Sequence, residues 1–507
     1  MILAWTAGFG IPFAGSSSGK EAPMFDLSFR RPAASKTLGL LGAIALLALP
    51  AAAAAQSADE LTEDARQYVQ YGDAVIAITG VQVVDGTGAA PRSGQTVVIA
   101  DRRIQSLGAD GDVQVPEGAR QIDGSGHTVI PGLIGIHNHT FYTTAARHSQ
   151  MNTTSPRLYL AAGVTTIRTT GSYSPYSEIN MRRAIDAGEI VGPRMHITGP
   201  YISGAGASTY MTQVSNPEDA RRVVAYWAEE GATWFKAYTR ISRAELGAAI
   251  EEAHKHGLKF TAHLCSVTFR EAVDLGIDSL EHGFFTNTEY HPGKEPDDCP
   301  PDFRNTLRDI DIDSDEVNAT ISHMVDNEVA LTSTLAVYEL SVPGRPPLED
   351  RNLEALSPGA RDEYLARREE IAGASDAVMQ DLFPKAQAFE YRYFQAGGLL
   401  AAGVDPTGNG GALPGFGDQR NYELLLEAEF TPAQALQVMS LNGARVLGVD
   451  GDLGSIEEGK LADLILIDGD PVTDPFQIRN VVTVFKDGVG YDSLKLIASV
   501  KGLVGLE

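Results

Sequence analysis

An apolar run from Val129 to Thr140 ends in two histidines, His137 and His139, with Asn138 between them. In an extended strand, successive side chains alternate between two faces, so both imidazoles point to one face and Asn138 points to the other. Two imidazoles on one face at the end of a strand can bind one transition-metal ion. They could equally be strand histidines without a ligand, and the rest of the chain decides between these interpretations.

After Pro131, strand patterns alternate with helical patterns, which is typical of βα units and a parallel sheet. A helix is predicted at 243–256. Eight such units over about 310 residues predict an α/β fold with a (β/α)8 TIM barrel, in which the carboxyl ends of the strands meet at one site. Beyond the first strand, further strands are predicted at 163–170, 194–199, 233–238, 260–264, 279–283, 330–335 and 399–405.

Both ends of the chain carry β patterns outside the predicted barrel. Together they favour one small β-sandwich domain built from N- and C-terminal segments. The 507 residues suit a barrel of about 250 residues with a smaller domain beside it. The β patterns lie at 74–86, 96–100, 103–108, 454–467 and 481–488. The expected domains are a polar arm at 56–72 with the first sandwich part to 130, the barrel at 131–447 with a last helix at 431–447, and the second sandwich part at 448–507.

Two long additions interrupt the barrel pattern. Residues 285–316 are rich in Pro, Asp and Glu, and residues 345–395 are charged and helical in character. Loops of that length at the carboxyl face of a barrel form lids or extra walls, although a solvated surface excursion fits them as well. Gly408–Gly415 is predicted to be a loop at the barrel mouth. It is not a phosphate cradle, because no Gly-Lys-Ser/Thr pattern follows it.

The N-terminal segment has the pattern of a signal peptide. Basic residues at 30, 31 and 36 precede an apolar run from Leu38 to Leu49 and a series of alanines that ends at Ala55. We predict a leader and signal peptide over 1–55, with Met24 as the start, cleavage after Ala55, and a periplasmic or secreted mature protein. An uncleaved anchor is disfavoured because the apolar run is shorter than the roughly 20 residues that a span needs.

The charge balance restricts the partners. With 40 basic and 66 acidic residues, the formal net charge is −26, which argues against nucleic acid or an anionic membrane as a partner. A small-molecule substrate fits this balance, and a homo-oligomer is left open.

Further ligand-type side chains fall where the predicted barrel strands end. Lys236 lies in an apolar strand beside Phe235, and a lysine that points into a barrel mouth is costly unless its charge is compensated. Residues at the ends of different strands converge in this fold. The set comprises His137, His139, Lys236, His263, His282 and Asp405.

In these residues the chain resembles the amidohydrolase superfamily, metal-dependent hydrolases with a barrel beside a composite β-sandwich. It is most similar to the imidazolonepropionase-like and Xaa-Pro-dipeptidase-like branch. The stretches that carry the resemblance are Pro131–His139, Gly163–Arg168, Lys236, His263, Ser279–Gly283, Asp405 and Gly454–Leu464.

The resemblance implies two divalent metal ions. His137, His139 and Asp405 would hold the more buried ion, and His263 and His282 the second. Lys236, carboxylated by CO2, would bridge both. Zinc is the first choice for this nitrogen and oxygen donor set, and other divalent ions stay open.

The implied activity is hydrolysis of an amide bond in a dipeptide, an N-acyl amino acid or a related linear or cyclic amide, with a metal-bridging hydroxide as nucleophile. Asp405 would accept the proton and pass it to the leaving amine. Val404 and Pro406 flank Asp405 here, whereas the family often has Thr before the aspartate. The alternatives are lactone or phosphotriester hydrolysis at the same site, or a metal-binding protein without turnover. A mononuclear deaminase is disfavoured, because Lys236 supplies the bridge that two metals need.

Three weaker predictions concern neighbouring residues. Tyr238 and Arg240 continue the inward phase of Lys236 and are candidates for substrate contacts, with core packing and a solvated loop as the respective alternatives. Arg168 is predicted to be a structural ion-pair partner. Cys265 and Cys299 would both lie near the barrel mouth of an exported protein, and we predict a disulfide between them.

Overall fold

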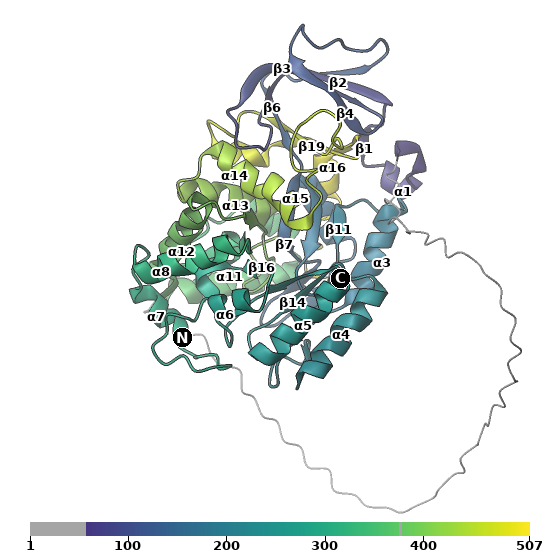
Figure 1. Cartoon of the computed structure of the whole chain (residues 1–507). Coiled ribbons are helices and arrows are strands. Elements are labelled where there is room, and N and C mark those ends of the chain that lie inside the picture. The colour runs from purple at the N-terminus through teal and green to yellow at the C-terminus, as the bar shows by residue number, and fades with distance from the viewer. Residues whose placement is uncertain (1–56, 375–377, 507) are drawn as a thin grey trace, which may run out of the picture. The chain divides into compact units, whose positions relative to one another are not determined.

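The computed structural model describes residues 57–374 and 378–506 (Figure 1). The predicted signal peptide and its cleavage site lie outside the described residues. Strands and helices alternate along much of the described chain, so the predicted α/β fold is confirmed. None of the described helices combines the length and the apolar character that a membrane span needs.

Two parallel sheets contain the strands that were predicted from residue 131 onwards. One has the order β11-β10-β7, and the other has the order β13-β12-β14-β15-β16-β17-β18. Most of these strands are buried along their whole length, which explains their continuous apolar runs. Their bounds are β7 (Leu133–Asn138), β10 (Val164–Thr169), β11 (Arg194–His196), β12 (Thr198–Ser203), β13 (Thr212–Gln213), β14 (Trp234–Ala237), β15 (Lys259–Ala262), β16 (Ser279–Glu281), β17 (Ala330–Ser333) and β18 (Leu400–Ala402).

The stretch that contains the third predicted strand belongs to both sheets. Only Ile197 separates β11, which pairs with β10, from β12, which pairs with β14. At the two far edges, the backbone N–H of Asp405, just after β18, donates to the carbonyl of His137 on β7 at 2.8 Å. Gly403 permits this approach, because a Cβ there would lie 2.2 Å from the His137 backbone nitrogen.

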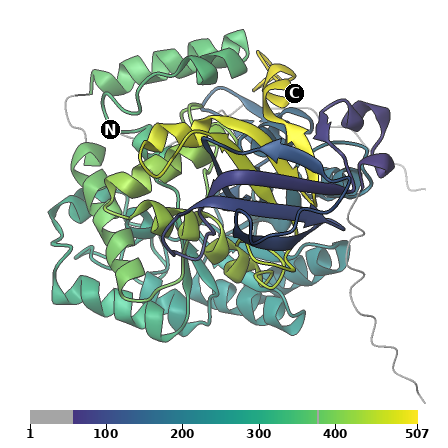
Figure 2. The ribbon, with the colours of Figure 1, turned by 90° about the horizontal axis from the view of Figure 1, so that it is seen from above.

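A nine-stranded sheet combines both ends of the chain. Its order is β1-β21-β20-β19-β6-β2-β3-β4, with β5 paired to β2. Figure 2 shows the purple N-terminal strands beside the yellow C-terminal ones. A separate two-stranded sheet pairs β8 (Phe141–Thr143) with β9 (His148–Gln150). The nine strands are β1 (Val69–Tyr71), β2 (Val75–Val83), β3 (Arg92–Ala100), β4 (Arg103–Ala109), β5 (Arg120–Asp123), β6 (His127–Pro131), β19 (Leu464–Asp468), β20 (Val481–Lys486) and β21 (Val489–Asp492).

The apolar run before the histidines is two strands rather than the single strand expected. β6 ends at Pro131 in the nine-stranded sheet, and β7 starts at Leu133 in a parallel sheet. Between them, a Cβ on Gly132 would lie 2.2 Å from the Thr165 hydroxyl oxygen, so glycine lets the chain pass close to β10. One apolar run therefore serves two sheets.

Helices follow the parallel strands. Helices α4 and α5 lie beside one another and pack on β12, β14 and β15 (Figure 1). The helical segments are η1 (Ala58–Glu60), α1 (Glu63–Arg66), α2 (Thr154–Ala161), α3 (Pro175–Asp186), α4 (Pro217–Glu230), α5 (Arg243–Lys255), α6 (Phe269–Asp274), η2 (Gly283–Thr286), α7 (Phe303–Asp309), α8 (Asp315–Asp326), α9 (Leu335–Glu339), α10 (Asp350–Ala355), α11 (Pro358–Ala372), α12 (Val378–Gln395), α13 (Phe416–Glu427), α14 (Pro432–Met439), α15 (Leu441–Leu447), η3 (Pro475–Arg479) and α16 (Ser493–Ala498).

Local sequence explains where two of the predicted helices begin and end. The helix predicted at 243–256 is α5, and Ser242 and Glu245 form a capping box at its start. The helix predicted at 431–447 is two helices, because the backbone of Ser440 leaves the helical region between α14 and α15.

The acidic addition at 285–316 is fastened to the parallel strands. Cys265, just after β15, forms the predicted disulfide with Cys299, with 5.0 Å between their Cα atoms. Lys294 donates to the carbonyl of Ser266 at 2.7 Å. These links hold the segment before α7 against the carboxyl end of β15.

Candidate metal centre

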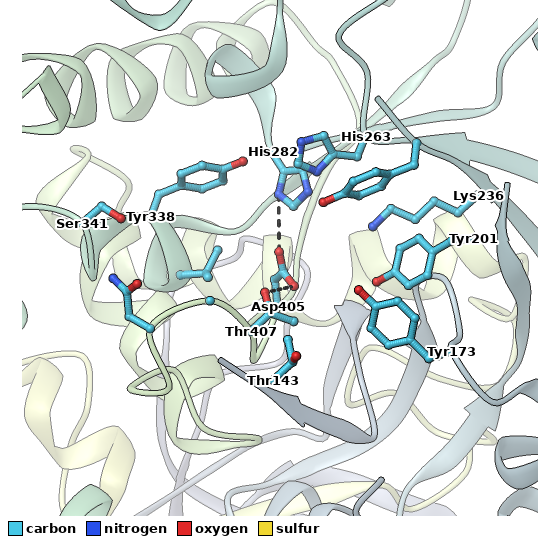
Figure 3. Close-up of a pocket in the computed structure, with 14 residues that line it drawn as sticks. Thr143, Tyr173, Tyr201, Lys236, His263, His282, Tyr338, Ser341, Asp405 and Thr407 are labelled. Carbon is cyan, nitrogen blue, oxygen red and sulfur yellow. Dashed lines mark hydrogen bonds and ion pairs between the residues drawn. The ribbon is translucent and has the colours of Figure 1, made fainter. Parts of the chain in front are cut away.

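The six predicted ligand residues gather at the carboxyl ends of the parallel strands. Four of them, Lys236, His263, His282 and Asp405, line a cavity of about 310 Å³ (Figure 3). His137 and His139 lie behind Asp405 and are fully buried. His137, His282 and Asp405 each offer one ligand atom, and these three atoms lie within 4.8 Å of one another, so they could hold a metal ion.

The carboxylate of Asp405 lies between the two histidines of the His-x-His pair. Its oxygens are 3.7 Å from His137 Nε2 and 3.2 Å from His139 Nε2. The side chain of Asn138 points elsewhere, accepting from the Val404 N–H at 3.0 Å. The alternation predicted for this run is therefore present.

Glu281 fixes the orientation of His137. Its carboxylate is fully buried and lies 2.6 Å from His137 Nδ1, 2.5 Å from Arg168 Nη2 and 2.5 Å from the Thr261 hydroxyl. Burial opposes ionisation, but the positive charge of Arg168 and the contact with His137 hold the pKa of Glu281 well below its ordinary value. With its Nδ1 hydrogen on Glu281, His137 presents an Nε2 lone pair to the site.

Glu281 is a site residue that the sequence interpretation missed, although it stands directly before His282 in a quoted stretch. The sequence signal that could have identified Glu281 was an acidic residue inside an apolar strand. The predicted ion-pair role of Arg168 is confirmed by its contact with Glu281.

His282 is held in a similar way. Its Nδ1 lies 2.7 Å from the Thr334 hydroxyl, and its buried Nε2 has no hydrogen-bond partner among the described residues. His282 follows β16 with φ +69°, in the left-handed region that turns its side chain out of the strand phase. The ring of His263 packs against it, with 4.4 Å between the ring centroids.

Lys236 reaches the same point from β14. Its Nζ lies 3.1 Å from His137 Nε2 and 3.1 Å from the Thr170 carbonyl. Burial lowers the pKa of Lys236 to about 8. The unmodified amine therefore contacts His137, while Lys236 itself lines the cavity.

The donor set fits divalent metal ions. Burial lowers the pKa values of the four histidines, so their imidazoles are neutral, and neutral imidazole is the metal-binding form. The His139 Nδ1 and the His282 Nε2 are buried without a partner among the described residues. Burial opposes ionisation of Asp405, yet the neighbouring histidines hold its pKa well below the usual range. Neutral imidazoles around one carboxylate suit zinc and similar ions.

The structure separates the two predicted substrate contacts. Tyr238 lines the cavity, whereas Arg240 is exposed and does not. The inward alternation stops because β14 ends at Ala237, and the backbone N–H of Arg240 turns to the Ser203 hydroxyl at 3.3 Å. The structure gives Arg240 no place in the cavity lining, and its contact with a substrate stays a prediction.

Three further tyrosines line the cavity and were missed in the sequence. Tyr201 stands on β12 with its hydroxyl 3.3 Å from His139 Nε2, and Tyr173 and Tyr338 follow β10 and β17 (Figure 3). Tyr201 stands late in a parallel strand, Tyr173 follows one, and Tyr338 lies on α9, the helix after β17. Their position relative to the strand ends was the signal, but aromatic residues at such places also pack in cores.

The comparisons with known proteins give the family. The model of the amidohydrolase family matches residues 128–333 and 409–490, more than half of the chain. The chain belongs to the amidohydrolase family, and the resemblance stated above is confirmed. Asp405 lies in the unmatched stretch between the two ranges.

Solved structures agree with this assignment. A candidate prolidase from Bifidobacterium longum is 25% identical, with a TM-score of 0.62 and coverage of 84% of this chain and 98% of that one. A Xaa-Pro dipeptidase with bound methionine in its active site is 21% identical, with a TM-score of 0.63 and coverage of 82% and 100%. At 21% identity, the likeness to the Xaa-Pro dipeptidase shows the fold alone.

Curated relatives match over short stretches. A 5-methylthioadenosine/S-adenosylhomocysteine deaminase of Moorella thermoacetica is 39% identical over 79 residues, which are 14% of this chain. The chain spans 18% of that relative's length. The activity of the whole protein is therefore a matter for proposal.

Proposed function

We propose that the chain is an exported, metal-dependent amidohydrolase that uses two divalent ions, with zinc as the first choice, to cleave an amide bond in a peptide-like small molecule. The carrying observation is the convergence of four buried or cavity-lining histidines, Lys236 and Asp405 at one end of the parallel strands. The candidate prolidase from Bifidobacterium longum, which aligns with 84% of this chain, supports peptide-like substrates.

Each residue has a role in this proposal. His137, His139 and Asp405 would hold the inner ion, and His263 and His282 the outer one, with carboxylated Lys236 between them. When bound, the ions supply Lewis-acid activation of the scissile carbonyl and of a water molecule. Asp405 accepts the proton from the attacking water and delivers it to the leaving amine. Glu281 accepts from His137 Nδ1 and so keeps His137 in the tautomer that presents a lone pair to the site, and Thr334 orients the ring of His282.

The proposal includes a (β/α)8 barrel beside a composite β-sandwich. The barrel is supported by the order of the parallel strands, by the stretch 194–203 that joins both sheets, and by the Asp405–His137 backbone hydrogen bond between the two edges. The sandwich is supported by the pairing of β19 with β6, which unites both chain ends in one sheet. The domain boundaries, the signal peptide and the periplasmic or secreted location remain predictions.

Metal content by elemental analysis tests this proposal. The protein, reconstituted with zinc and bicarbonate, is expected to hold two ions per chain, and Lys236→Ala one or none. Lys259→Ala is the matched control, because Lys259 lies on the neighbouring β15 and donates to the Val446 carbonyl at 2.9 Å, away from the cavity. The control should keep both ions.

Other results reject parts of the proposal. One ion in all three proteins excludes the lysine bridge and favours mononuclear chemistry. No ion after reconstitution rejects a metal-dependent activity. With two ions present, release of amines from dipeptides and N-acyl amino acids supports amide hydrolysis, whereas turnover confined to lactones or phosphotriesters refutes it.

A further inference from the structure

The aromatic residues of the cavity wall continue beyond the cavity lining. Tyr173 lines the cavity beside Tyr201, with 5.0 Å between their ring centroids (Figure 3). The Tyr173 ring also meets the rings of His148 at 4.7 Å and Tyr210 at 5.8 Å. The rings of His148 and Tyr210 stack on each other at 5.2 Å. We call His148, Tyr173 and Tyr210 the outer aromatic cluster.

The outer aromatic cluster presents aromatic surface to solvent. Tyr210 is 63% exposed and His148 is exposed as well, whereas Tyr173 is half-buried. A single exposed tyrosine needs no explanation. Here, however, the exposed rings are continuous, through Tyr173, with the lining of the cavity at the candidate metal centre. An apolar part of a ligand that extends from this cavity can therefore leave water against the cluster.

One buried ring separates the outer aromatic cluster from the candidate metal centre. Phe141 is fully buried, and its ring centroid lies 4.6 Å from that of Tyr173 and 4.5 Å from that of His139. Tyr173 is therefore two ring contacts away from a predicted metal ligand. A side group next to an amide at this centre can reach that far.

Outside the predicted metal ligands, the described lining of the cavity is uncharged. It consists of four tyrosines, three hydroxyl side chains, one amide, one valine and one glycine. An aromatic group suits this lining, because it gains from leaving water and from face or edge contacts with the tyrosine rings.

The exposed histidine of the cluster stands on a fastened hairpin. His148 starts β9, which pairs with β8. The preceding residue, Arg147, forms an ion pair with Glu363 at 2.7 Å and donates to the Gly505 carbonyl at 3.1 Å. The hairpin is thus linked to α11 and to the C-terminal segment.

The exposed tyrosine is held in a similar way. Tyr210 stands between β12 and β13, which pair with each other. The side chain of Gln213 accepts from the Gly206 N–H at 3.1 Å and donates to the Ala207 carbonyl at 3.0 Å, so it ties this segment together. Rings that are held in place before a ligand arrives lose little conformational entropy on binding.

We propose that the outer aromatic cluster is a specificity subsite that binds an aromatic group of the substrate next to the scissile amide. The proposal rests on the proposed amidohydrolase function and narrows its substrates to peptide-like amides with an aromatic group. The same contacts fit an aromatic group on the acyl side or on the amine side of the amide, and the experiment distinguishes the two.

Two pairs of compounds test the subsite, and the members of each pair differ only in the saturation of one ring. N-benzoylglycine and N-cyclohexanecarbonylglycine test the acyl side, and N-acetyl-L-phenylalanine and N-acetyl-L-cyclohexylalanine test the amine side. Release of the amino acid by the metal-loaded protein gives kcat/KM. The wild type should prefer the aromatic member of one pair by roughly 2- to 10-fold, the range for one aromatic contact. Equal kcat/KM values within both pairs overturn the proposal.

Variants assign this preference to the cluster. Tyr173→Leu and Tyr210→Ala should bring the kcat/KM ratio of the preferred pair close to one, whereas Tyr173→Phe, which keeps the ring, should retain it. Tyr226→Ala is the matched control, because Tyr226 is 48% exposed and contacts Trp227 on α4, outside the cavity lining. It should keep the wild-type ratio. A wild-type ratio in Tyr173→Leu and Tyr210→Ala, with or without an overall loss of activity, overturns the proposal.

Binding separates this proposal from the proposed function. If the metal-loaded wild type hydrolyses none of the four compounds, amide hydrolysis fails for this substrate class, and calorimetry with the same compounds decides on the subsite. Tighter binding of an aromatic member that is weakened in Tyr210→Ala and kept in Tyr226→Ala supports the subsite. Equal affinities within both pairs, or no binding at all, overturn it.

Discussion

Glu390 is a buried acid whose replacement should stabilise the protein at neutral pH. It lies on α12 against Gly283, the residue after His282, and is 1% exposed. Neither carboxyl oxygen has a hydrogen bond of normal geometry among the described residues. Burial, offset only in part by the nearby Ser333 hydroxyl, raises the pKa of Glu390 from 4.5 to about 8. Glu390→Gln removes this titration and keeps the size of the side chain.

The magnitude follows from linkage between protonation and folding. Because the folded pKa is raised, Glu390 costs nothing below pH 4.5 and destabilises the fold increasingly as pH rises to 8. The slope is about 1.4 kcal/mol per pH unit, which gives about 3 kcal/mol at pH 7. Glu390→Gln should therefore match the wild type near pH 4.5 and exceed its free energy of unfolding by about 3 kcal/mol at pH 7.

Urea unfolding at pH 5, 6, 7 and 8 measures this difference. Glu281→Gln is the matched control, since Glu281 is equally buried but bound to Arg168 and His137. Its loss leaves a buried guanidinium without its partner, which costs about 3–5 kcal/mol at neutral pH. The reasoning is refuted if the advantage of Glu390→Gln does not grow with pH, or if both variants change stability in the same direction at pH 7.

Two further perturbations test the framework of the site. Reduction of the disulfide, which spans 34 residues, should lower the free energy of unfolding by about 4 kcal/mol, as urea unfolding with and without reductant would show; an unchanged midpoint would contradict it. Gly403→Ala places a Cβ 2.2 Å from the His137 backbone nitrogen and should cost more than about 3 kcal/mol or prevent folding. Thermal unfolding with Gly451→Ala as control, where a Cβ meets nothing within 4 Å, checks this, and equal melting temperatures would refute it.

The residues that the sequence identified share one property: each stands at the carboxyl end of an apolar strand. His137, Lys236 and Asp405 could be placed because β-strand phase and the order of parallel strands define where such ends meet. The same alternation, continued from Lys236, predicted that Tyr238 faces the site. Arg240 does not line the cavity, because strand alternation holds only while the strand continues and β14 stops at Ala237.

Strand alternation and strand order could not predict residues whose role depends on tertiary contacts. Glu281 alternates out of phase with His282, and only the left-handed backbone at His282 brings both toward His137. The acidic segment before α7 is held by a disulfide between Cys299 and Cys265, which are 34 residues apart in the sequence. No local pattern encodes such a placement.

The nine-stranded sheet has a direct bearing on the metal centre. β6 pairs with β19 from His127 to Pro131, and the chain then enters β7 and reaches His137 within six residues. Arg194, at the start of β11, pairs with Asp463 at 3.0 Å and Asp487 at 2.8 Å, both in the C-terminal segment. The C-terminal segment therefore contacts the starts of β7 and β11. The far end of β7 carries site residues, and so do strands next to β11. The strand that carries His137 and leads to His139 therefore starts directly after a paired strand of the nine-stranded sheet, and both histidines meet Asp405 at its far end.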